Sequence, residues 1–480
     1  MHRPIAQAAA VCASRSARGV RRALDRPGLL RWSAGAKRGQ ATASASASST
    51  AWRPISVLDE WVSKEARPIS LRQLMVFGKN LTESRLIDSA NYLRTELPTR
   101  IAHRIRDMQQ LPYAVVSNKH ISEVYDLYYN AFDNFRKVKH IQSDEENDAL
   151  CKTIRKNLQA HLTVIPKLAM GILESDGLMD PQALDKFMNT ILRSRISRRV
   201  IAEQHLSLTE TFHSSWFVPG MKLNASEYVG EVFIKCLAKD VVERCGKAVQ
   251  ELARTTYGPS VKIPEIKVSG HQHTSFPYIL SHIEYIVGEL LRNSVQAVVE
   301  QQLRHPHLVE EPLPPIEVTI CSSAQHVILR ISDRGGGIPR DELPYLWSFS
   351  KGPKSKARLE ALQRVPLMAA TLEELQTGES SSGYLHDEIG RADLRAPSFA
   401  TAAVPVPVTS SSGSLTSLSS RPPDLRLGMG LPLSRVYAEY WAGSLNVHSL
   451  EGYGVDAFLQ IPKLGNKNEQ LATRATMDAV

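Results

Sequence analysis

Apolar residues recur at intervals of three and four from about residue 55 to residue 212, a stretch where Pro and Gly are sparse. Such spacing places apolar side chains on one face of a helix. The predicted long helices cover residues 88–111, 118–137, 147–173 and 180–208. In the last of them Asp180 is a suitable N-cap and Pro181 takes the first helical position. Four long amphipathic helices with short links predict an antiparallel helical bundle over residues 55–215.

The second half of the chain contains four short runs in which apolar and polar residues alternate, which is the period of a β-strand. The runs cover residues 316–323, 326–333, 443–450 and 455–462. Short loops within each pair predict two hairpins. Helices are predicted within residues 225–258, between short extended pieces, and over residues 279–303. These elements predict an α+β domain with a mixed sheet over residues 225–465.

Residues 351–424 are a poor candidate for a compact element, and their second half is rich in Ser, Pro and Ala with few charges. We predict that residues 396–424 form a disordered or mobile loop. The polar residues 466–480 form a separate C-terminal tail.

The net charge of +9 is concentrated in the first 50 residues, which hold eight Arg and one Lys against the single acid Asp25. The remaining chain is close to neutral, unlike a basic nucleic-acid-binding surface. An Arg- and Ser-rich segment almost without acids is typical of a mitochondrial transit peptide, and the alternative is a disordered basic tail. No apolar run reaches the ~18 residues that a membrane span needs. The five scattered cysteines suggest neither a disulfide framework nor a zinc site, which favours a reducing compartment.

Glu289 and Asn293 stand four residues apart in the helix predicted over residues 279–303, so both side chains project from one side of it. An Asn oxygen can help to hold Mg²⁺ together with phosphate oxygens and water. A neighbouring carboxylate can accept a proton from an attacking hydroxyl group. The alternative is that Glu289 pairs with Arg292 at the surface and that Asn293 is incidental.

Two glycine-rich segments contain further candidate binding residues. Asp333 ends a predicted strand and precedes three glycines, where its carboxylate can accept a hydrogen bond from an adenine amino group; the alternative is an ordinary turn capped by Asp. Gly428 and Gly430 precede a helix with Pro432 in its first turn. Free backbone N–H groups at a helix N-terminus bind anions and suit a polyphosphate, although a loop-to-helix junction has the same pattern.

Taken together in chain order, the Glu289/Asn293 helix, the glycine segment after Asp333 and the segment with Gly428 and Gly430 resemble the ATP-binding fold of the GHKL superfamily. DNA gyrase, Hsp90, histidine kinases and MutL share this fold. Other stretches are similar to the mitochondrial α-ketoacid dehydrogenase kinases, which act on the pyruvate and branched-chain complexes. They include residues 93–113, 161–171, 194–205 and 289–297. The resemblance covers residues 68–212 and 225–463, and residues 205–210 and Tyr285 are slightly more similar to the branched-chain enzyme.

The resemblance implies a four-helix bundle followed by a GHKL-type α/β sandwich that binds ATP and Mg²⁺, with residues 351–424 as an expanded nucleotide lid. It also implies a protein-serine/threonine kinase of the mitochondrial matrix, despite the histidine-kinase-like fold. The implied partners are the dehydrogenase component and the lipoyl-bearing acyltransferase core, which the bundle would bind, and the kinase is expected to be a homodimer.

The resemblance also assigns roles to individual residues. Glu289 corresponds to the general base and Asn293 to the Mg²⁺ ligand. Asp333 corresponds to the residue that binds adenine. The remaining expected nucleotide-binding residues are Gly335, Gly337, Ser350, Gly428, Gly430 and Leu431. His161 corresponds to a residue that interacts with the catalytic carboxylate, and the alternative is a buried histidine of the bundle.

The chain departs from the family pattern at Arg292, where Lys is usual, at Gln296, where Arg is usual, and at Arg426, which replaces the first glycine of the second box. The tail also lacks the Asp-Trp end of many pyruvate dehydrogenase kinases. Two other functions stay open. A histidine autokinase would need an acid beside its phosphoacceptor, which residues 160–163 lack, and a non-catalytic adaptor would keep the fold without the activity.

Overall fold

The computed structural model describes residues 55–215, 217, 228–304, 313–364 and 427–471. All of them belong to one unit, Pro54–Val480. The predicted transit peptide and the predicted loop at residues 396–424 lie outside the described residues. Within the described ranges, no helix combines the length and the apolar character needed to cross a membrane.

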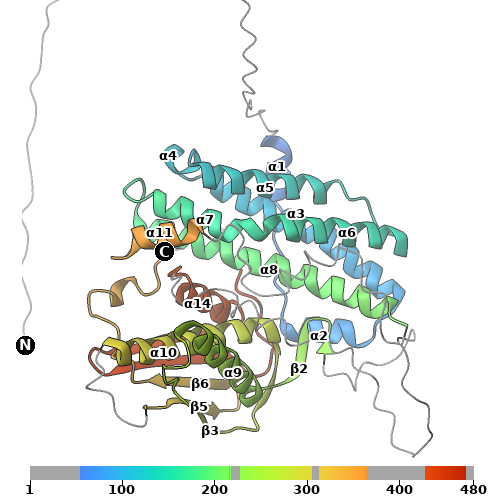
Figure 1. Ribbon diagram of the computed structural model, residues 1–480. Helices are drawn as coiled ribbons and strands as arrows, with labels where there is room; N and C mark the ends of the chain where they lie inside the picture. The colour runs from blue at the N-terminus through green and yellow to red at the C-terminus, as the bar shows by residue number, and fades with distance from the viewer. Residues whose placement is uncertain (1–54, 216, 218–227, 305–312, 365–426, 472–480) are drawn as a thin grey trace, which may run out of the picture. The chain divides into compact units, whose positions relative to one another are not determined.

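The first part of the described chain is helical, as its apolar spacing predicts (Figure 1). Its helices are α1 (Ile55–Val62), α2 (Leu71–Lys79), α3 (Glu83–Gln109), α4 (Tyr113–Val116), α5 (Lys119–Arg136), α6 (Asp144–Ala160), α7 (Val164–Glu174) and α8 (Pro181–His213). The predicted start of α8 is confirmed, because the Asp180 carboxylate accepts a hydrogen bond from the Ala183 N–H at 3.0 Å.

The single helix predicted over residues 147–173 is wrong. The 3₁₀ turn η1 (His161–Thr163) separates α6 from α7. Pro166 explains the interruption, because a proline inside a continuous α-helix has no N–H to donate and its ring collides with the carbonyl group four residues earlier. The turn leaves Pro166 in the first turn of α7, where these costs are small.

The second part of the chain contains two sheets. Its elements are β1 (Tyr228–Val229), β2 (Val232–Leu237), α9 (Ala238–Tyr257), β3 (Ile266–Gly270), β4 (Ser275–Ile279), α10 (Leu280–Arg304), β5 (Ile316–Ser322), β6 (His326–Asp333), η3 (Leu343–Tyr345), α11 (Ser355–Gln363), α14 (Gly430–Tyr440), β7 (Ser444–Leu450) and β8 (Gly454–Pro462). The larger sheet has the order β3-β5-β6-β8-β7, and the smaller has the order β1-β2-β4. Both predicted hairpins form, while β3 pairs with β5 in parallel. The predicted α+β class with a mixed sheet is confirmed.

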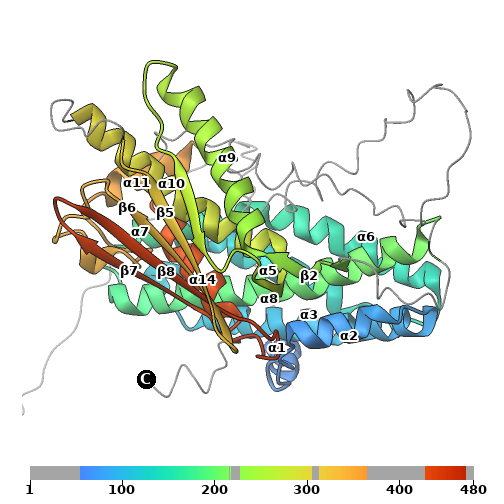
Figure 2. The same ribbon diagram turned by 90° about the horizontal axis from the view of Figure 1, so that it is seen from below.

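Helices α9, α10 and α14 pack against the five-stranded sheet (Figure 2). Strand β6 shows the cause, because Val327, Leu329 and Ile331 are buried and alternate with more exposed residues. Successive side chains of a strand point to opposite faces. Asp333 continues this alternation, so its carboxylate lies on the same buried face as the three apolar side chains.

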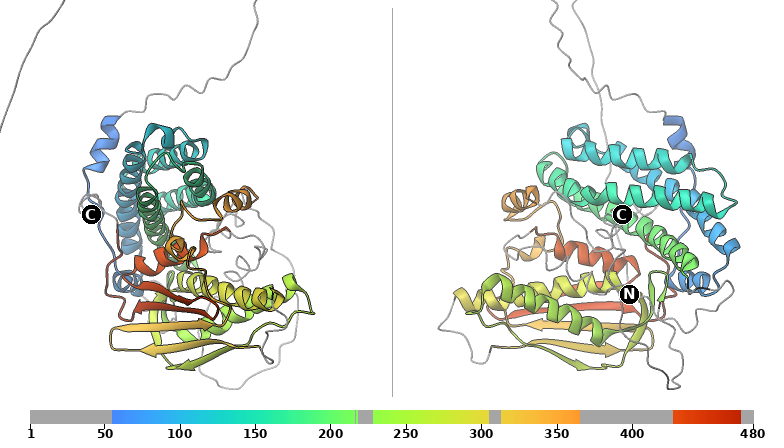
Figure 3. Two further views of the ribbon diagram at one scale, coloured as in Figure 1. Left: turned by 90° about the vertical axis from the view of Figure 1, so that its left-hand side faces the viewer. Right: turned by 45° about the vertical axis from the view of Figure 1, so that its right-hand side comes forward.

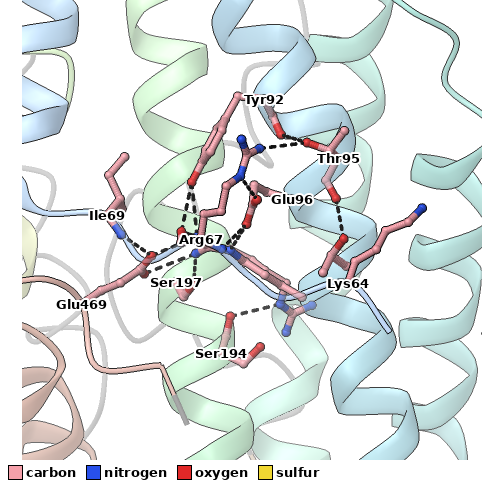
Figure 4. A network of polar contacts seen from close by, with 12 residues as sticks. Lys64, Arg67, Ile69, Tyr92, Thr95, Glu96, Ser194, Ser197 and Glu469 are labelled. Atoms are coloured by element: carbon pink, nitrogen blue, oxygen red, sulfur yellow. Dashed lines mark hydrogen bonds and ion pairs between the residues drawn. The ribbon is translucent and has the colours of Figure 1, made fainter. Parts of the chain in front are cut away.

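The helical part and the sheet part meet along α8 and α14, which lie next to each other in Figure 3. A polar network around Glu469 joins them a second time (Figure 4). The buried Glu469 carboxylate is 2.9 Å from Arg100 Nη2 on α3, and it accepts hydrogen bonds from the Ile69 N–H at 3.1 Å and from the Tyr440 hydroxyl group on α14. Arg100 is also paired with Glu96 at 3.2 Å. The network therefore ties the end of the described chain to both parts.

Candidate active site

A cavity of about 730 Å³ opens beside α10, within the size range of small-molecule binding sites. Its wall comes from α10, the segment after β6, α11, the start of α14 and the strands β7 and β8. Most of the residues that the sequence predicts for the site line it together: Glu289, Asn293, Asp333, Gly335, Gly337, Gly428, Gly430 and Leu431. Two predicted residues, His161 and Ser350, do not line it.

Glu289 and Asn293 reach the cavity from one side of α10, as their spacing predicts. Glu289 is only 4% exposed, and its Oε1 lies 4.0 Å from Nη1 of Arg292, which is 7% exposed. The pair with Arg292 is therefore present but buried, and a surface ion pair does not explain the carboxylate. A buried carboxylate at a cavity wall is suited to proton transfer.

Gly430, the first residue of α14, lies against the Glu289 carboxylate. A Cβ atom on Gly430 would lie closer than 3.0 Å to Glu289 Oε2 and 3.3 Å from its Cδ. Glycine therefore lets the two elements approach closely without displacing the carboxylate. It brings the N-terminus of α14, with its unpaired N–H groups and positive helix-dipole end, to the same cavity, where an anion is stabilised.

Asp333 is held at the end of β6 by two hydrogen bonds. Its Oδ2 accepts from the Ser294 hydroxyl group and its Oδ1 accepts from the Gly335 N–H, both at 2.9 Å. Burial raises the pKa of the carboxyl group, and these hydrogen bonds oppose the increase. A carboxylate has about four acceptor positions, so Asp333 can accept a further hydrogen bond from a ligand in the cavity.

The glycines after Asp333 allow the chain to turn closely between α10 and the β7–β8 hairpin. A Cβ atom on Gly335 would lie 2.5 Å from the Ala297 Cβ. Gly337 has a φ of +73°, which L side chains rarely adopt, and a Cβ atom there would overlap the Leu450 carbonyl oxygen. The segment can therefore approach a ligand with its bare backbone.

Ser350 lies against the helical part of the protein instead of lining the cavity. The Asp185 carboxylate of α8 accepts hydrogen bonds from the Ser350 N–H at 3.0 Å, the Phe349 N–H at 2.9 Å and the Ser348 hydroxyl group at 2.6 Å. The Ser350 hydroxyl group donates to the Pro181 carbonyl oxygen at 3.3 Å. These contacts fix the segment that leads into α11.

Helix α11 contributes to the cavity wall, and the sequence analysis did not predict it. Lys354, Ala357, Arg358, Ala361 and Arg364 are among the cavity residues from this part of the chain. Figure 1 shows α11 beside α7, against which it packs. The spacing of Leu359 and Leu362 was the available signal for a short helix.

His161 lies in the helical part, in the turn η1, and does not line the cavity that contains Glu289. Its ring stacks on Tyr128 with a centroid distance of 5.4 Å, and its Nε2 lies 3.3 Å from the Leu127 carbonyl oxygen. Burial and the nearby charge of Arg198 lower the pKa of His161 to about 3. The residue is therefore neutral at physiological pH.

The donor set around the cavity fits Mg²⁺ bound together with a polyphosphate. Asn293 is exposed to the cavity, and its amide makes no hydrogen bond to any other residue that the structure describes. Groups of three or more His, Cys, Asp or Glu side chains that could enclose a metal ion are absent from the described ranges. Mg²⁺ is commonly bound by one or two protein oxygens, with water and phosphate oxygens as the other ligands.

The fold and the cavity define an α+β protein with a cavity whose size and lining suit an anionic small molecule. Residues 68–233 match the family model described as mitochondrial branched-chain alpha-ketoacid dehydrogenase kinase. A mitochondrial pyruvate dehydrogenase (acetyl-transferring) kinase 2 of Saccharomyces cerevisiae is 32% identical to this chain, over 85% of this chain and 84% of that protein. A mitochondrial pyruvate dehydrogenase (acetyl-transferring) kinase of Arabidopsis thaliana is 29% identical, over 86% and 94%.

Isozyme 4 of the mitochondrial pyruvate dehydrogenase (acetyl-transferring) kinase of Rattus norvegicus is 26% identical over 84% of this chain and 82% of that protein. This chain belongs to the mitochondrial α-ketoacid dehydrogenase kinase family. It is a mitochondrial protein kinase that uses ATP.

Proposed function

We propose that this chain phosphorylates, and thereby inactivates, the dehydrogenase component of the pyruvate dehydrogenase complex in the mitochondrial matrix, with Mg-ATP as the phosphoryl donor. The observation that carries the proposal is that Glu289, Asn293, Asp333 and both glycine segments line one cavity. Phosphoryl transfer needs mainly positioning and neutralisation of charge, and these residue types provide both.

Each residue then has one task. Asp333 accepts a hydrogen bond from the adenine amino group, and the N–H groups at the start of α14 receive the polyphosphate. Glu289 accepts the proton of the substrate hydroxyl group. Bound Mg²⁺ would neutralise charge on the phosphates, with Asn293 as its protein ligand. His161 and Ser350 do not line the cavity, so their contribution is indirect, through the helical part for His161 and through the segment before α11 for Ser350.

The names of the relatives support pyruvate dehydrogenase as the substrate. Those relatives are named pyruvate dehydrogenase kinases and match this chain over more than four fifths of its length. The branched-chain family model matches residues 68–233. Branched-chain dehydrogenase is therefore the second candidate substrate.

The proposal includes the finer architecture that the resemblance implies. Residues 1–50 would be a transit peptide, residues 55–215 a four-helix bundle, and residues 225–465 a GHKL-type ATP-binding domain with a lid insertion at 351–424 and a tail at 466–480. The bundle would bind the lipoyl-bearing acyltransferase core, and the kinase would act as a homodimer.

The test is to incubate the purified protein with labelled ATP and Mg²⁺ and with either dehydrogenase component in turn. We expect label on serine of the pyruvate dehydrogenase component. Label on the branched-chain component alone would change the substrate. Acid-labile label on the kinase itself would favour a histidine autokinase, and binding without any transfer would favour an adaptor.

A further inference from the structure

We propose that Arg358 of α11 contacts the polyphosphate of the bound nucleotide and that Asp185 of α8 positions it there. Arg358 lines the same cavity as Glu289 and Asn293. The inference rests on the proposed use of Mg-ATP and adds to it a binding residue from α11, a helix that the sequence motifs do not include.

The position of the guanidinium group is defined by three stretches of backbone. A Cβ atom on Gly428 would lie closer than 3.0 Å to Cδ, Nε and Cζ of Arg358, so the side chain lies directly on that glycine. A Cβ atom on Gly352 would lie 3.3 Å from Nη2. Nη1 donates to the Ser348 carbonyl oxygen at 3.5 Å. Gly428 is two residues before the start of α14, so this cation stands beside the anion-binding end of that helix.

Arg358 differs from two other cations of the cavity wall, Lys354 and Arg304, in its partners. Lys354 is paired with Glu342 at 2.6 Å, and Arg304 is paired with Glu300 at 2.9 Å. Arg358 has no carboxylate within ion-pair distance among the residues that the structure describes, although Glu342 and Asp185 are near enough to act on its charge. Its remaining N–H groups are therefore available as far as the described residues are concerned, and a guanidinium group binds phosphate oxygens through two parallel hydrogen bonds.

The burial of the Arg358 side chain supports a role in which a bound anion balances its charge. The Arg358 side chain is half-buried, and burial lowers its pKa, as expected for a cation taken out of water. A polyphosphate in the cavity would stabilise the charged form of the guanidinium group again. Adenine would lie toward Asp333 in the proposed function, so the contact involves the phosphates and not the base.

Asp185 anchors the segment that precedes α11. Its carboxylate holds Ser348, Phe349 and Ser350 by three hydrogen bonds of 2.6–3.0 Å. The same Ser348 provides the carbonyl oxygen that Arg358 contacts. Asp185 is thus a positioning residue, because it acts on the nucleotide through this segment and Arg358.

The test measures the affinities of the full-length protein for ATP and AMP, both in the presence of Mg²⁺, in the wild type and in Arg358→Gln. AMP keeps adenine and ribose but lacks the β- and γ-phosphates. We expect ATP affinity to fall about tenfold or more, the range of a charged hydrogen bond, and AMP affinity to stay within about twofold. Lys356→Gln is the matched control, since it removes a charge from the exposed side of the same helix. It should leave both affinities unchanged.

Asp185→Ala should weaken ATP binding in the wild type but add little in the Arg358→Gln background, because the two residues act on one contact. Asp185→Asn should retain most of the ATP affinity, since its amide oxygen can still accept from the Phe349 and Ser350 N–H groups. Equal ATP affinity in wild type and Arg358→Gln would overturn the assignment of Arg358, as would an equal loss for AMP. If the losses of ATP affinity in Asp185→Ala and Arg358→Gln were fully additive in the double variant, the assignment of Asp185 as a positioning residue would be overturned. A wild-type protein that binds no Mg-ATP would instead refute the proposed function.

Discussion

Replacing Gly430 by Ala is expected to reduce the activity of the kinase without reducing its stability. The new Cβ atom would lie closer than 3.0 Å to Glu289 Oε2, whereas ordinary contact begins at 3.4 Å, so the carboxylate has to move by about 1 Å. A displacement of this size at a reacting group can cost about 100-fold in rate. The φ angle of Gly430 lies outside the left-handed region, so Ala fits the backbone; at the first residue of α14 it improves helix propensity by less than the ~1 kcal/mol of an interior position.

The assay combines the rate of phosphate transfer under saturating Mg-ATP with the thermal midpoint of unfolding. We expect kcat to fall about 100-fold, while the midpoint stays equal or rises. In the Glu289→Asp background the shorter side chain leaves space for the methyl group, so Gly430→Ala should cost much less there. Unchanged kcat in the single variant would refute the reasoning, and so would a full additional loss in the double variant.

Three further predictions concern the nucleotide base, pH and the buried network. Asp333→Asn should weaken ATP and ADP binding by the same factor, because the contact is to adenine; a loss for ATP alone would place Asp333 near the γ-phosphate. Burial lowers the pKa of His205 to about 4, so the unfolded chain takes up this proton below about pH 6.5 and folding stability falls until about pH 4. Urea unfolding should show that the free energy of unfolding falls between pH 7 and pH 5 by about 2 kcal/mol less in His205→Gln than in the wild type. An equal fall in the two proteins would contradict this prediction. Glu469→Ala should cost about 3–5 kcal/mol of unfolding free energy, against less than about 1 kcal/mol for the exposed Glu60→Ala, and a loss near that of the control would show that the network is not stabilising.

Local patterns were sufficient for much of the fold. The capping by Asp180 and the two hairpins follow from residues that are close in sequence, and the structure has them where the pattern predicts. The predicted helix over residues 147–173 failed because the apolar residues stay periodic across the 3₁₀ turn, while Pro166 disfavours a continuous helix at that point.

The sequence predicts the residues of the candidate site as motifs, but it does not predict how these residues come together in space. Each motif identifies its own residues, yet the close approach of Gly430 to Glu289 joins residues on two different helices. Asp185 and Ser350 are 165 positions apart, and Arg100 and Glu469 are 369 apart. Glu469 stands in a polar tail whose composition predicts exposure. Its burial depends on a partner charge that only the folded chain brings near.

The most direct test of the proposed active site is a comparison of Glu289→Gln with the wild type in a single-turnover transfer from bound Mg-ATP to the pyruvate dehydrogenase component. The substitution keeps the size of the side chain and removes its ability to accept a proton. We expect ATP affinity to remain close to that of the wild type, while the transfer rate falls by about 10²–10⁴. Full transfer activity in the variant, or loss of ATP binding, would contradict the account.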